Sequence, residues 1–142
     1  MPEASVIMVC DDEAHIVHVV SMKLRNAGYE VITASDGEEG LALAREQRPD
    51  LIVTDFEMPG LTGVEMCAAL REDAQTRGIP ALMLTARGFR LDEGEVERAR
   101  ISEVLSKPFS PREVLGKVKH LLDSDSADDG GLSSGAAARE AA

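Results

Sequence analysis

Aromatic side chains are scarce in this sequence, and tryptophan is absent from it. Phe and Tyr together make up 3% of the 142 residues, so a buried core has to be built from aliphatic side chains. Apolar residues nevertheless account for 44% of the chain, which is too many for a disordered polymer. A chain of this length can bury a core without disulfides or a structural metal, and we expect one globular domain.

Positive charge is also scarce. The chain carries 15 Lys and Arg against 26 Asp and Glu, which gives a net charge of -11. Proteins that bind duplex nucleic acid displace counterions with clustered Lys and Arg. Binding to an anionic membrane surface has the same requirement. We therefore expect neither direct nucleic-acid binding nor membrane binding.

Cysteines are few, and long apolar segments are missing. Cys10 and Cys67 fall in different predicted elements, and neither belongs to a CxxC pair. We expect both to be reduced, buried thiols, as in cytosolic proteins. The first residues contain neither a basic segment nor a long apolar stretch, so the sequence predicts no signal peptide and no membrane span. These features together predict a cytoplasmic protein.

Short apolar segments alternate with helical patterns along the chain. Strands are predicted at residues 6–10, 29–33, 51–54, 79–84 and 101–105. Helices are predicted at residues 13–27, 36–47, 62–73 and 91–100, and from 110 to about 123. Alternation of this kind predicts an α/β fold, a doubly wound sheet of five parallel strands with helices on both faces.

Two of the predicted helices have clear start signals. Thr62 and Glu65 have the spacing of a capping box, in which each side chain accepts a backbone N–H of the other residue. Ser110 and Glu113 have the same spacing, and Pro111 lies between them at the first helical position. Both helices should begin at these residues.

The helix at residues 91–100 is the weakest of the predicted elements. Gly94 lies inside it and destabilises it by about 1 kcal/mol relative to Ala. Arg100 and Ile101 lie at its end, so the helix has no Gly there to stop it. We expect this helix to be mobile, with faster hydrogen exchange than the last helix.

The composition changes after Asp123. Ser, Asp, Gly and Ala dominate the last residues, and they supply no apolar stripe. We expect a folded domain at residues 1–123 and a disordered tail at residues 124–142. Such a tail is too short and too polar to form a second domain.

Polar side chains follow four of the five predicted strands, at the point where each strand ends. The first strand is followed by Asp11 and Asp12, the third by Asp55, the fourth by Thr85, and the fifth by Lys107. In doubly wound sheets, ligands bind beyond the carboxyl ends of the strands. We therefore expect these five side chains to converge on one shallow pocket.

The chemistry of that pocket follows from its residue types. Three crowded carboxylates repel one another, and a hard divalent cation such as Mg²⁺ removes the conflict because it prefers oxygen ligands. A Lys ammonium and a Thr hydroxyl beside the metal add a point cation and a hydrogen-bond donor. Together they form a receptor for a phosphoryl group. A carboxylate in such a receptor can itself be the nucleophile and give an aspartyl phosphate.

In order, spacing and strand position, these residues resemble the receiver domain of two-component response regulators, especially the stand-alone chemotaxis-type regulators. The resemblance covers residues 5–123. It is carried by the pair Asp11-Asp12, the segment at residues 55–60, the pair Thr85-Ala86, and Lys107-Pro108-Phe109. It implies a flavodoxin-like (βα)5 fold and phosphorylation-controlled signalling rather than enzymatic turnover.

The resemblance also implies a metal site and a phosphoacceptor. Asp55 would accept the phosphoryl group from a sensor histidine kinase or a histidine phosphotransfer protein. Asp12 and Asp55 would bind Mg²⁺, or Mn²⁺ in its place, together with the backbone carbonyl of Glu57. Asp11 would act through a metal-bound water.

The remaining matched residues surround the phosphoryl group. Thr85 and Lys107 are implied to bind its oxygens, and the small side chain of Ala86 leaves room for it. Pro108 matches a cis-proline position of the family, and X-Pro bonds are where cis peptides occur.

Three positions bear on regulation. The family often carries Tyr or Phe three residues before the site lysine as a rotamer switch, whereas this chain has Val104. The readout of phosphorylation should therefore differ, with Phe109 or the helix at residues 91–100 as its carrier. Glu57 and Arg87 match positions that tune dephosphorylation, and an opposite-charge pair there would shield the acyl phosphate from water.

Partners follow from the same resemblance. A downstream target protein would dock on the face formed by the helix at residues 91–100, the strand at 101–105 and the last helix. Output would come from this docking or from relay of the phosphoryl group. The protein would be a monomer or a weak, phosphorylation-dependent dimer.

Two other functions fit parts of the pattern. A Mg²⁺-dependent phosphatase of the haloacid-dehalogenase type also uses Asp, Thr and Lys, but it places its nucleophile in a DxD arrangement after the first strand. A degenerate receiver that only binds partners would not need the complete acidic set. His15 and His18 have helical spacing but lack a third ligand, and His120 reads as a surface residue.

Overall fold

The structure is a computed structural model that describes residues 4–86 and 92–131, with side chains as far as Asp123. Five parallel strands form one sheet in the order β2-β1-β3-β4-β5. The strands are β1 (Val6–Cys10), β2 (Glu30–Ala34), β3 (Leu51–Asp55), β4 (Ala81–Thr85) and β5 (Glu103–Ser106). The predicted five-stranded parallel sheet is confirmed.

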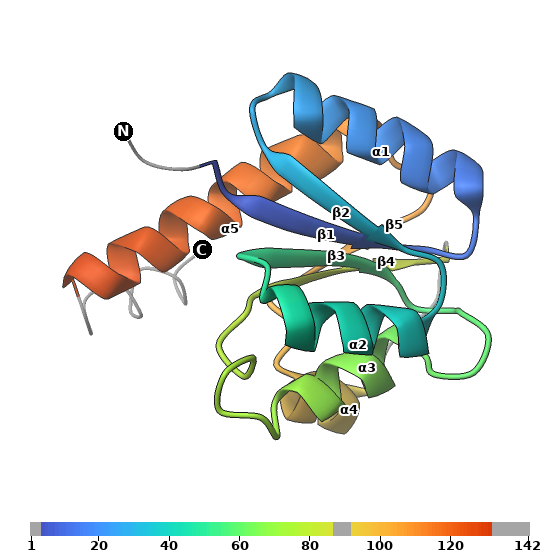
Figure 1. Cartoon of the computed structure of the whole chain (residues 1–142), viewed down its shortest axis with the longest axis vertical. Coiled ribbons are helices and arrows are strands. Elements are labelled where there is room, and N and C mark those ends of the chain that lie inside the picture. The colour runs from blue at the N-terminus through green and yellow to red at the C-terminus, as the bar shows by residue number, and fades with distance from the viewer. Residues whose placement is uncertain (1–3, 87–91, 132–142) are drawn as a thin grey trace.

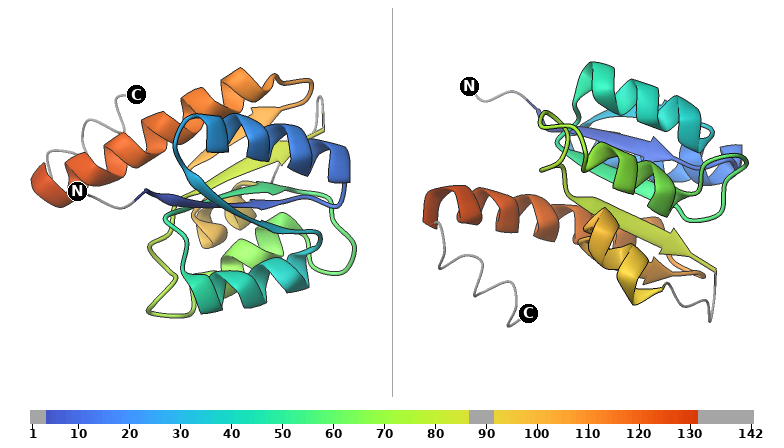
Figure 2. Two further views of the ribbon diagram at one scale, coloured as in Figure 1. Left: turned by 45° about the horizontal axis from the view of Figure 1, so that its top comes forward. Right: turned by 90° about the horizontal axis from the view of Figure 1, so that it is seen from below.

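Helices cover both faces of this sheet (Figure 1). They are α1 (Ala14–Asn26), α2 (Gly37–Gln47), α3 (Gly63–Leu70), α4 (Glu93–Ala99) and α5 (Pro111–Gly131). On one face α1 packs beside α5, and on the other α3 lies between α2 and α4 (Figures 1 and 2). This is the doubly wound arrangement that the alternation predicts.

Alternate residues of the central strands point into two separate cores. The core under α2, α3 and α4 contains residues such as Met8, Ile52 and Met83, all fully buried. The core under α1 and α5 contains their neighbours in sequence. Because β1, β3 and β4 are buried on both faces, they read as continuous apolar runs. The prediction of an aliphatic core is confirmed.

Side-chain caps start α2, α3 and α5 near the residues where the sequence predicts these helices to begin. Thr62 and Glu65 exchange hydrogen bonds as a capping box at α3. Ser110 and Glu113 do the same at α5. At α2, Asp36 accepts the backbone N–H of Glu39 at 2.7 Å. Each cap satisfies a backbone donor that the helix itself leaves unpaired.

Several predicted boundaries are wrong by two or three residues. Helix α3 ends at Leu70 instead of residue 73, and β5 begins at Glu103 instead of residue 101. Helix α4 ends at Ala99 because Arg100 adopts the left-handed conformation, with φ 53°, that the missing Gly would have supplied. Residues other than glycine rarely adopt the left-handed conformation, so the sequence does not predict it for Arg100.

The last helix extends further than the composition predicts. Helix α5 continues past Asp123 to Gly131, so its backbone enters the segment for which we expected disorder. Ser124 to Asp129 include no Pro or Gly, and the helix ends at the pair Gly130-Gly131, which has low helix propensity. Residues 132–142 lie outside the described part of the chain.

Both cysteines are free and buried, as expected. Cys10 lies in β1 and Cys67 in α3, and burial raises the pKa of Cys10 to about 12 and of Cys67 to about 11. Among the described residues, no helix has the length and apolar character needed to cross a membrane.

Candidate active site

Four strands deliver polar side chains to one end of the sheet. Asp11 directly follows β1, Asp55 ends β3, Thr85 ends β4 and Lys107 directly follows β5. Parallel pairing aligns Asp55 with Leu84 and Thr85 with Ser106, which brings the strand ends level. The structure therefore brings these side chains to a common site, although they are spread over most of the chain.

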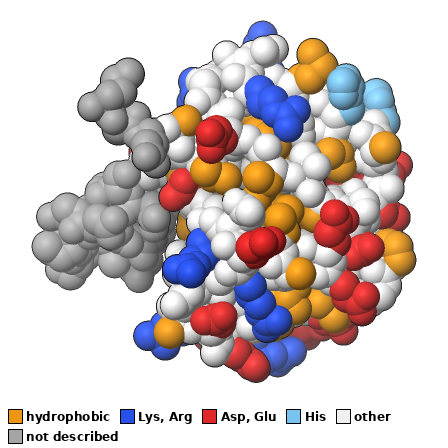
Figure 3. All heavy atoms as spheres, in the orientation of Figure 1, with side chains coloured by type: hydrophobic (Ala, Val, Ile, Leu, Met, Phe, Trp, Pro, Cys, Tyr) orange, Lys and Arg blue, Asp and Glu red, His pale blue; other side chains and the backbone are white. Residues whose placement is uncertain are grey.

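Three carboxylates lie close together in this site. The side chains of Asp11, Asp12 and Asp55 each offer an oxygen, and these oxygens all lie within 4.8 Å of one another. Asp11 and Asp55 are buried, whereas Asp12 is exposed. On the surface, acidic side chains gather on the side of the molecule toward which the strands run (Figure 3).

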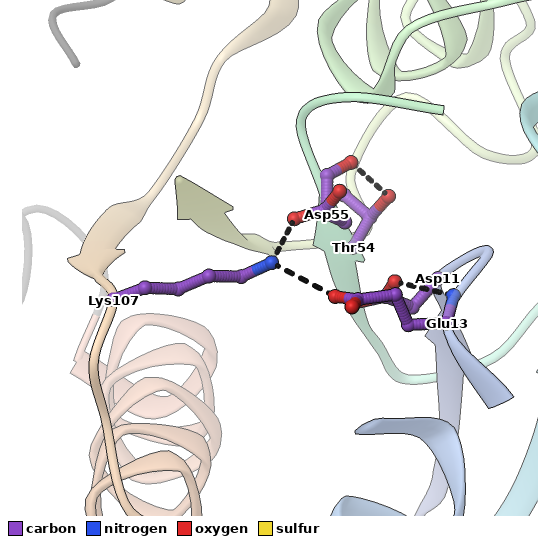
Figure 4. Close-up of polar contacts among 5 residues, drawn as sticks. All are labelled: Asp11, Glu13, Thr54, Asp55 and Lys107. Atoms are coloured by element: carbon purple, nitrogen blue, oxygen red, sulfur yellow. Dashed lines mark hydrogen bonds and ion pairs between the residues drawn. The ribbon is translucent and has the colours of Figure 1, made fainter. Parts of the chain in front are cut away.

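Asp55 is 5% exposed and is held by the backbone around it. The N–H of the next residue, Phe56, donates to the carbonyl of Leu84 at 2.9 Å, which continues the ladder between β3 and β4. The N–H of Gly63 then donates to the carbonyl of Phe56 at 2.9 Å, so α3 starts directly behind Asp55. The hydroxyl of Thr54 donates to the backbone carbonyl of Asp55 at 3.0 Å (Figure 4).

Lys107 reaches Asp55 from the opposite side of the site. Its backbone N–H donates to the carbonyl of Thr85 at 2.8 Å, and a cis peptide bond joins it to Pro108, as predicted. Its ammonium Nζ lies 3.2 Å from Asp55 Oδ1 and 3.4 Å from Glu13 Oε1 (Figure 4). Asp55 and Lys107 thus form a largely buried ion pair.

Glu13 is a site residue that the sequence reasoning missed. Its carboxylate joins the ion pair on Lys107 although the two residues are 94 positions apart. The available signal was its place as the third acid of the run Asp11-Asp12-Glu13, but we used Glu13 only as the start of the predicted helix at residues 13–27.

Two buried oxygens in the site have no hydrogen-bond partner among the described residues. Asp11 Oδ1 accepts the backbone N–H of Glu13 at 2.9 Å, but Asp11 Oδ2 accepts nothing. The hydroxyl of Thr85 is also unpartnered, and Thr85 is 1% exposed. A buried polar atom without a partner is costly, so both oxygens are placed as though to meet a ligand.

Electrostatics in the site follow from burial and crowding. Burial raises the pKa of Asp11 to about 6, and the nearby charge of Asp55 adds to the rise. Burial also raises the pKa of Asp55, against the opposing hydrogen bond and charge of Lys107. For Lys107, burial lowers the pKa, but the hydrogen bond and charge of Asp55 outweigh it and the net shift is upward.

The residues present fit a hard divalent cation. The donor set is made of carboxylate oxygens, two of the three carboxylates are buried, and Asp11 Oδ2 is without a hydrogen-bond donor. Mg²⁺ binds through one or two carboxylates and retained waters, and this arrangement offers them beside an ammonium. Burial and, to a lesser degree, the charge of Asp55 raise the pKa of Asp11, and a bound cation would oppose both effects.

The other positions that the resemblance singles out differ in exposure. Glu57, Ala86 and Val104 are exposed, with Val104 at 42%, and Phe109 is partly buried against the core under α1 and α5. Arg87 lies outside the described residues.

The three histidines take no part in the acidic cluster. His15 and His18 are exposed on α1, and His120 is exposed on α5. Within the described ranges, no group of three or more potential metal ligands includes any of them.

Comparisons with known proteins point in one direction. A family model described as the response regulator receiver domain matches residues 7–119. The alkaline phosphatase synthesis transcriptional regulatory protein PhoP of Bacillus subtilis is 46% identical over 116 residues, which are 82% of this chain and 48% of that protein. The chain thus spans about half the length of the curated relatives it matches.

Solved structures agree with the family match. The chemotaxis response regulator CheY4 of Vibrio cholerae is 37% identical with a TM-score of 0.76, and the match covers 82% of this chain and 98% of that one. The receiver domain of the sensor histidine kinase PA1611 of Pseudomonas aeruginosa is 27% identical with a TM-score of 0.76, covering 84% and 98%. The latter structure has a magnesium ion coordinated in its active-site cleft.

Proposed function

Since the chain belongs to the family of response regulator receiver domains, which accept a phosphoryl group on an aspartate in two-component signalling, we propose that Asp55 is the phosphoacceptor. The observation that carries the proposal is the position of Asp55. It is the one carboxylate of the acidic cluster that also pairs with Lys107. A phosphoryl group on its oxygen would lie between an ammonium and the cation-binding acids.

The reaction is a transfer between two nucleophiles. An oxygen of the Asp55 carboxylate attacks the phosphorus of a phosphohistidine, and a new P–O bond forms as the P–N bond breaks. The electron pair of the broken bond stays on the imidazole nitrogen of the donor. Lys107 exchanges its contact with Asp55 for one with a phosphoryl oxygen, and the unpartnered Thr85 hydroxyl donates to another.

The acids of the site would hold a metal ion. Asp11, Asp12 and Asp55, with the backbone carbonyl of Glu57, would bind Mg²⁺ or Mn²⁺. Receiver domains bind Mg²⁺ at an acidic site of this kind, and the PA1611 receiver domain holds it in its cleft. When bound, the ion neutralises the negative charge that accumulates between the carboxylates and the phosphoryl oxygens.

The partners are those of a signalling domain. The phosphoryl donor is a sensor histidine kinase or a histidine phosphotransfer protein, and the target docks on the α4–β5–α5 face. Val104 lies exposed in β5 on that face and offers a small apolar contact in place of an aromatic switch. The chain itself contacts neither nucleic acid nor membrane, which its net charge of -11 supports. It works in the cytoplasm, as a monomer or a weak phosphorylation-dependent dimer.

The alternative functions have less support. A haloacid-dehalogenase-type phosphatase would belong to another family than the one whose model matches residues 7–119. A degenerate receiver would have no use for the acidic cluster beside Lys107. We therefore propose that the chain catalyses only its own phosphorylation and dephosphorylation.

Incubation with acetyl phosphate and Mg²⁺ tests the proposal directly. The intact mass should rise by one phosphoryl group, and hydroxylamine should remove it, as expected for an acyl phosphate. Asp55→Asn should abolish the gain, whereas the matched control Asp123→Asn, at an exposed position on α5, should keep it. An unmodified wild-type protein, or equal labelling of Asp55→Asn, would contradict the proposal.

A further inference from the structure

Glu13 occupies a helix start but does not cap the helix. It is the N-cap residue of α1, where Ser, Thr, Asp or Asn usually accepts a backbone N–H of the first turn. No such side-chain hydrogen bond exists here, and α1 has no acidic residue in its first turn. The carboxylate of Glu13 therefore makes no capping hydrogen bond to α1 and is available for another contact.

The backbone of Glu13 is fixed by the neighbouring acid. Asp11 Oδ1 accepts the N–H of Glu13 at 2.9 Å, and the carbonyl of Glu13 accepts the N–H of Val17 at 3.1 Å. The turn from β1 into α1 is thus held at both ends. It directs the Glu13 side chain across the mouth of the site instead of back over its own helix (Figure 4).

The contact that results is with Lys107. Its Nζ lies 3.4 Å from Glu13 Oε1 and 3.2 Å from Asp55 Oδ1, so two carboxylates share one ammonium. The Glu13 side chain is 61% exposed and that of Asp55 is 7% exposed. Lys107 is therefore held between buried Asp55, which is proposed to become phosphorylated, and exposed Glu13, which stays a carboxylate.

A phosphoryl group on Asp55 needs the same ammonium. Lys has three N–H donors and no rigid fork, so its ammonium can turn from one acceptor to another. While Glu13 binds Lys107, the ammonium is less available to the phosphoryl oxygens, and the Glu13 carboxylate places a further negative charge near them. The pair is half solvated, and a pair of this kind is weak enough to be broken and re-formed.

From this geometry we propose that Glu13 is a positioning residue, which holds Lys107 at the mouth of the site and competes with the phosphoryl group for its ammonium. The inference rests on the proposed role of Asp55. Its consequence is that Glu13 limits how tightly, and for how long, a phosphoryl group is retained.

Beryllofluoride, which takes the place of the phosphoryl group on an aspartate, measures this competition without turnover. Titrated at saturating Mg²⁺, Glu13→Gln should bind beryllofluoride about threefold more tightly than the wild type, on the scale of a half-exposed ion pair. The phosphorylated variant should lose its phosphoryl group more slowly by a similar factor. The control is Glu46→Gln, which removes the same charge at an exposed position near the end of α2 and should change neither value.

The signal of the Lys107 ammonium by nuclear magnetic resonance reports whether Glu13 acts through Lys107. In the ligand-free protein this signal should shift in Glu13→Gln and not in Glu46→Gln. An unshifted signal, or unchanged or weaker beryllofluoride binding by Glu13→Gln, would overturn the inference while Asp55 remains the phosphoacceptor. Failure of the wild type to bind beryllofluoride would instead reject the proposed function itself.

Discussion

At the scale of single residues, the site keeps ionisable groups in an arrangement that is unfavourable by itself. Asp11 and Asp55 are buried next to each other, and within the described part of the chain their charge is opposed by Lys107 and the backbone N–H of Glu13. Buried like charges raise one another's pKa. In the ligand-free protein these buried carboxylates therefore repel each other, and a bound cation would reduce the repulsion.

The raised pKa of Asp11 makes the stability of the metal-free protein depend on pH. With a folded pKa of about 6 against 3.8 for an unperturbed Asp, the native state binds more protons than the unfolded state between these values. Stability from this group is therefore complete below about pH 4 and is lost as the pH rises to about 6. Asp11→Asn should remove this loss of stability. At pH 7 the free energy of unfolding of the variant should therefore be about 1–3 kcal/mol higher than that of the wild type.

Denaturant unfolding at several pH values, with a metal chelator present, measures the difference between the two proteins. The comparison isolates the effect of Asp11, because every other ionisable side chain is present in both the wild type and Asp11→Asn. A difference that does not grow between pH 4 and pH 6 would contradict the assignment.

Thr85 offers a second test at this scale. Its buried hydroxyl has no partner among the described residues, and an unpaired buried hydroxyl costs about 1–3 kcal/mol. Thr85→Val keeps the shape and removes the hydroxyl, so it should stabilise the ligand-free protein by about 1 kcal/mol. It should also weaken beryllofluoride binding. Stabilisation without weaker binding would mean that the hydroxyl does not face the phosphoryl group.

At the scale of elements, the site depends on how closely α3 approaches β3. A Cβ on Gly63 would lie on the backbone carbonyl oxygen of Asp55, closer than real Cβ atoms come to backbone, and 3.1 Å from Met83 Sδ. Gly63→Ala should therefore push α3 away from Asp55 and destabilise the fold by about 1–3 kcal/mol. Phosphorylation by acetyl phosphate should slow at the same time.

The matched control is Gly116→Ala, in the second turn of α5. A Cβ there meets no atom within 4 Å, so Ala should stabilise this helix by about 0.5–1 kcal/mol. Thermal unfolding of the two variants should thus move in opposite directions. A shift of the same sign in both would show that the close approach at Gly63 is not what limits substitution.

Arg71 connects the elements on the α4 side of the sheet. Its guanidinium donates to the carbonyl of Ala99 at 2.7 Å and to that of Arg77 at 2.9 Å, with longer bonds to Thr76 and Arg100. These carbonyls belong to the end of α4 and to the loop before β4. One half-buried side chain therefore holds the end of α4 in place. Helix α4 itself contributes a single buried residue, Ala99.

Arg71→Met should destabilise the protein by about 2–3 kcal/mol, because the carbonyls of the buried residues Thr76 and Ala99 lose a charged donor. Hydrogen exchange should accelerate most in α4, which we already expect to exchange faster than α5 in the wild type. Arg77→Met, at an exposed position in the neighbouring loop, is the control and should leave exchange unchanged. Slower exchange in α4 than in α5 would count against a mobile α4.

At the scale of the whole molecule, the net charge of -11 and the acidic end of the sheet favour cation binding. A ligand that binds only the native state stabilises it by mass action, so Mg²⁺ at tenfold over its Kd should add about 1.4 kcal/mol. Asp12→Asn should lose most of that gain. Thermal unfolding with and without Mg²⁺ measures this stabilisation in the wild type and in Asp12→Asn. Equal stabilisation of the two proteins would mean that the ion binds away from Asp12.

Much of the molecule was predictable because its signals are local. Five apolar runs alternating with helical patterns dictate a parallel sheet, and the capping boxes at Thr62 and Ser110 mark two helix starts within three residues of sequence. The convergence of Asp11, Asp55 and Lys107 followed from a general rule about strand ends. The sequence alone therefore determined the fold and the convergence of these strand-end residues, but not the part that Glu13 takes in the site.

The tertiary structure decided which side chains actually share a partner. The contact of Glu13 with Lys107 spans 94 positions, and the carbonyls that Arg71 binds lie up to 29 positions away. Arg100 adopts its left-handed conformation where α4 ends over the core, although nothing in its residue type calls for it. Such features depend on how separate elements pack against one another. Local sequence periodicity does not predict which residues of different elements come into contact.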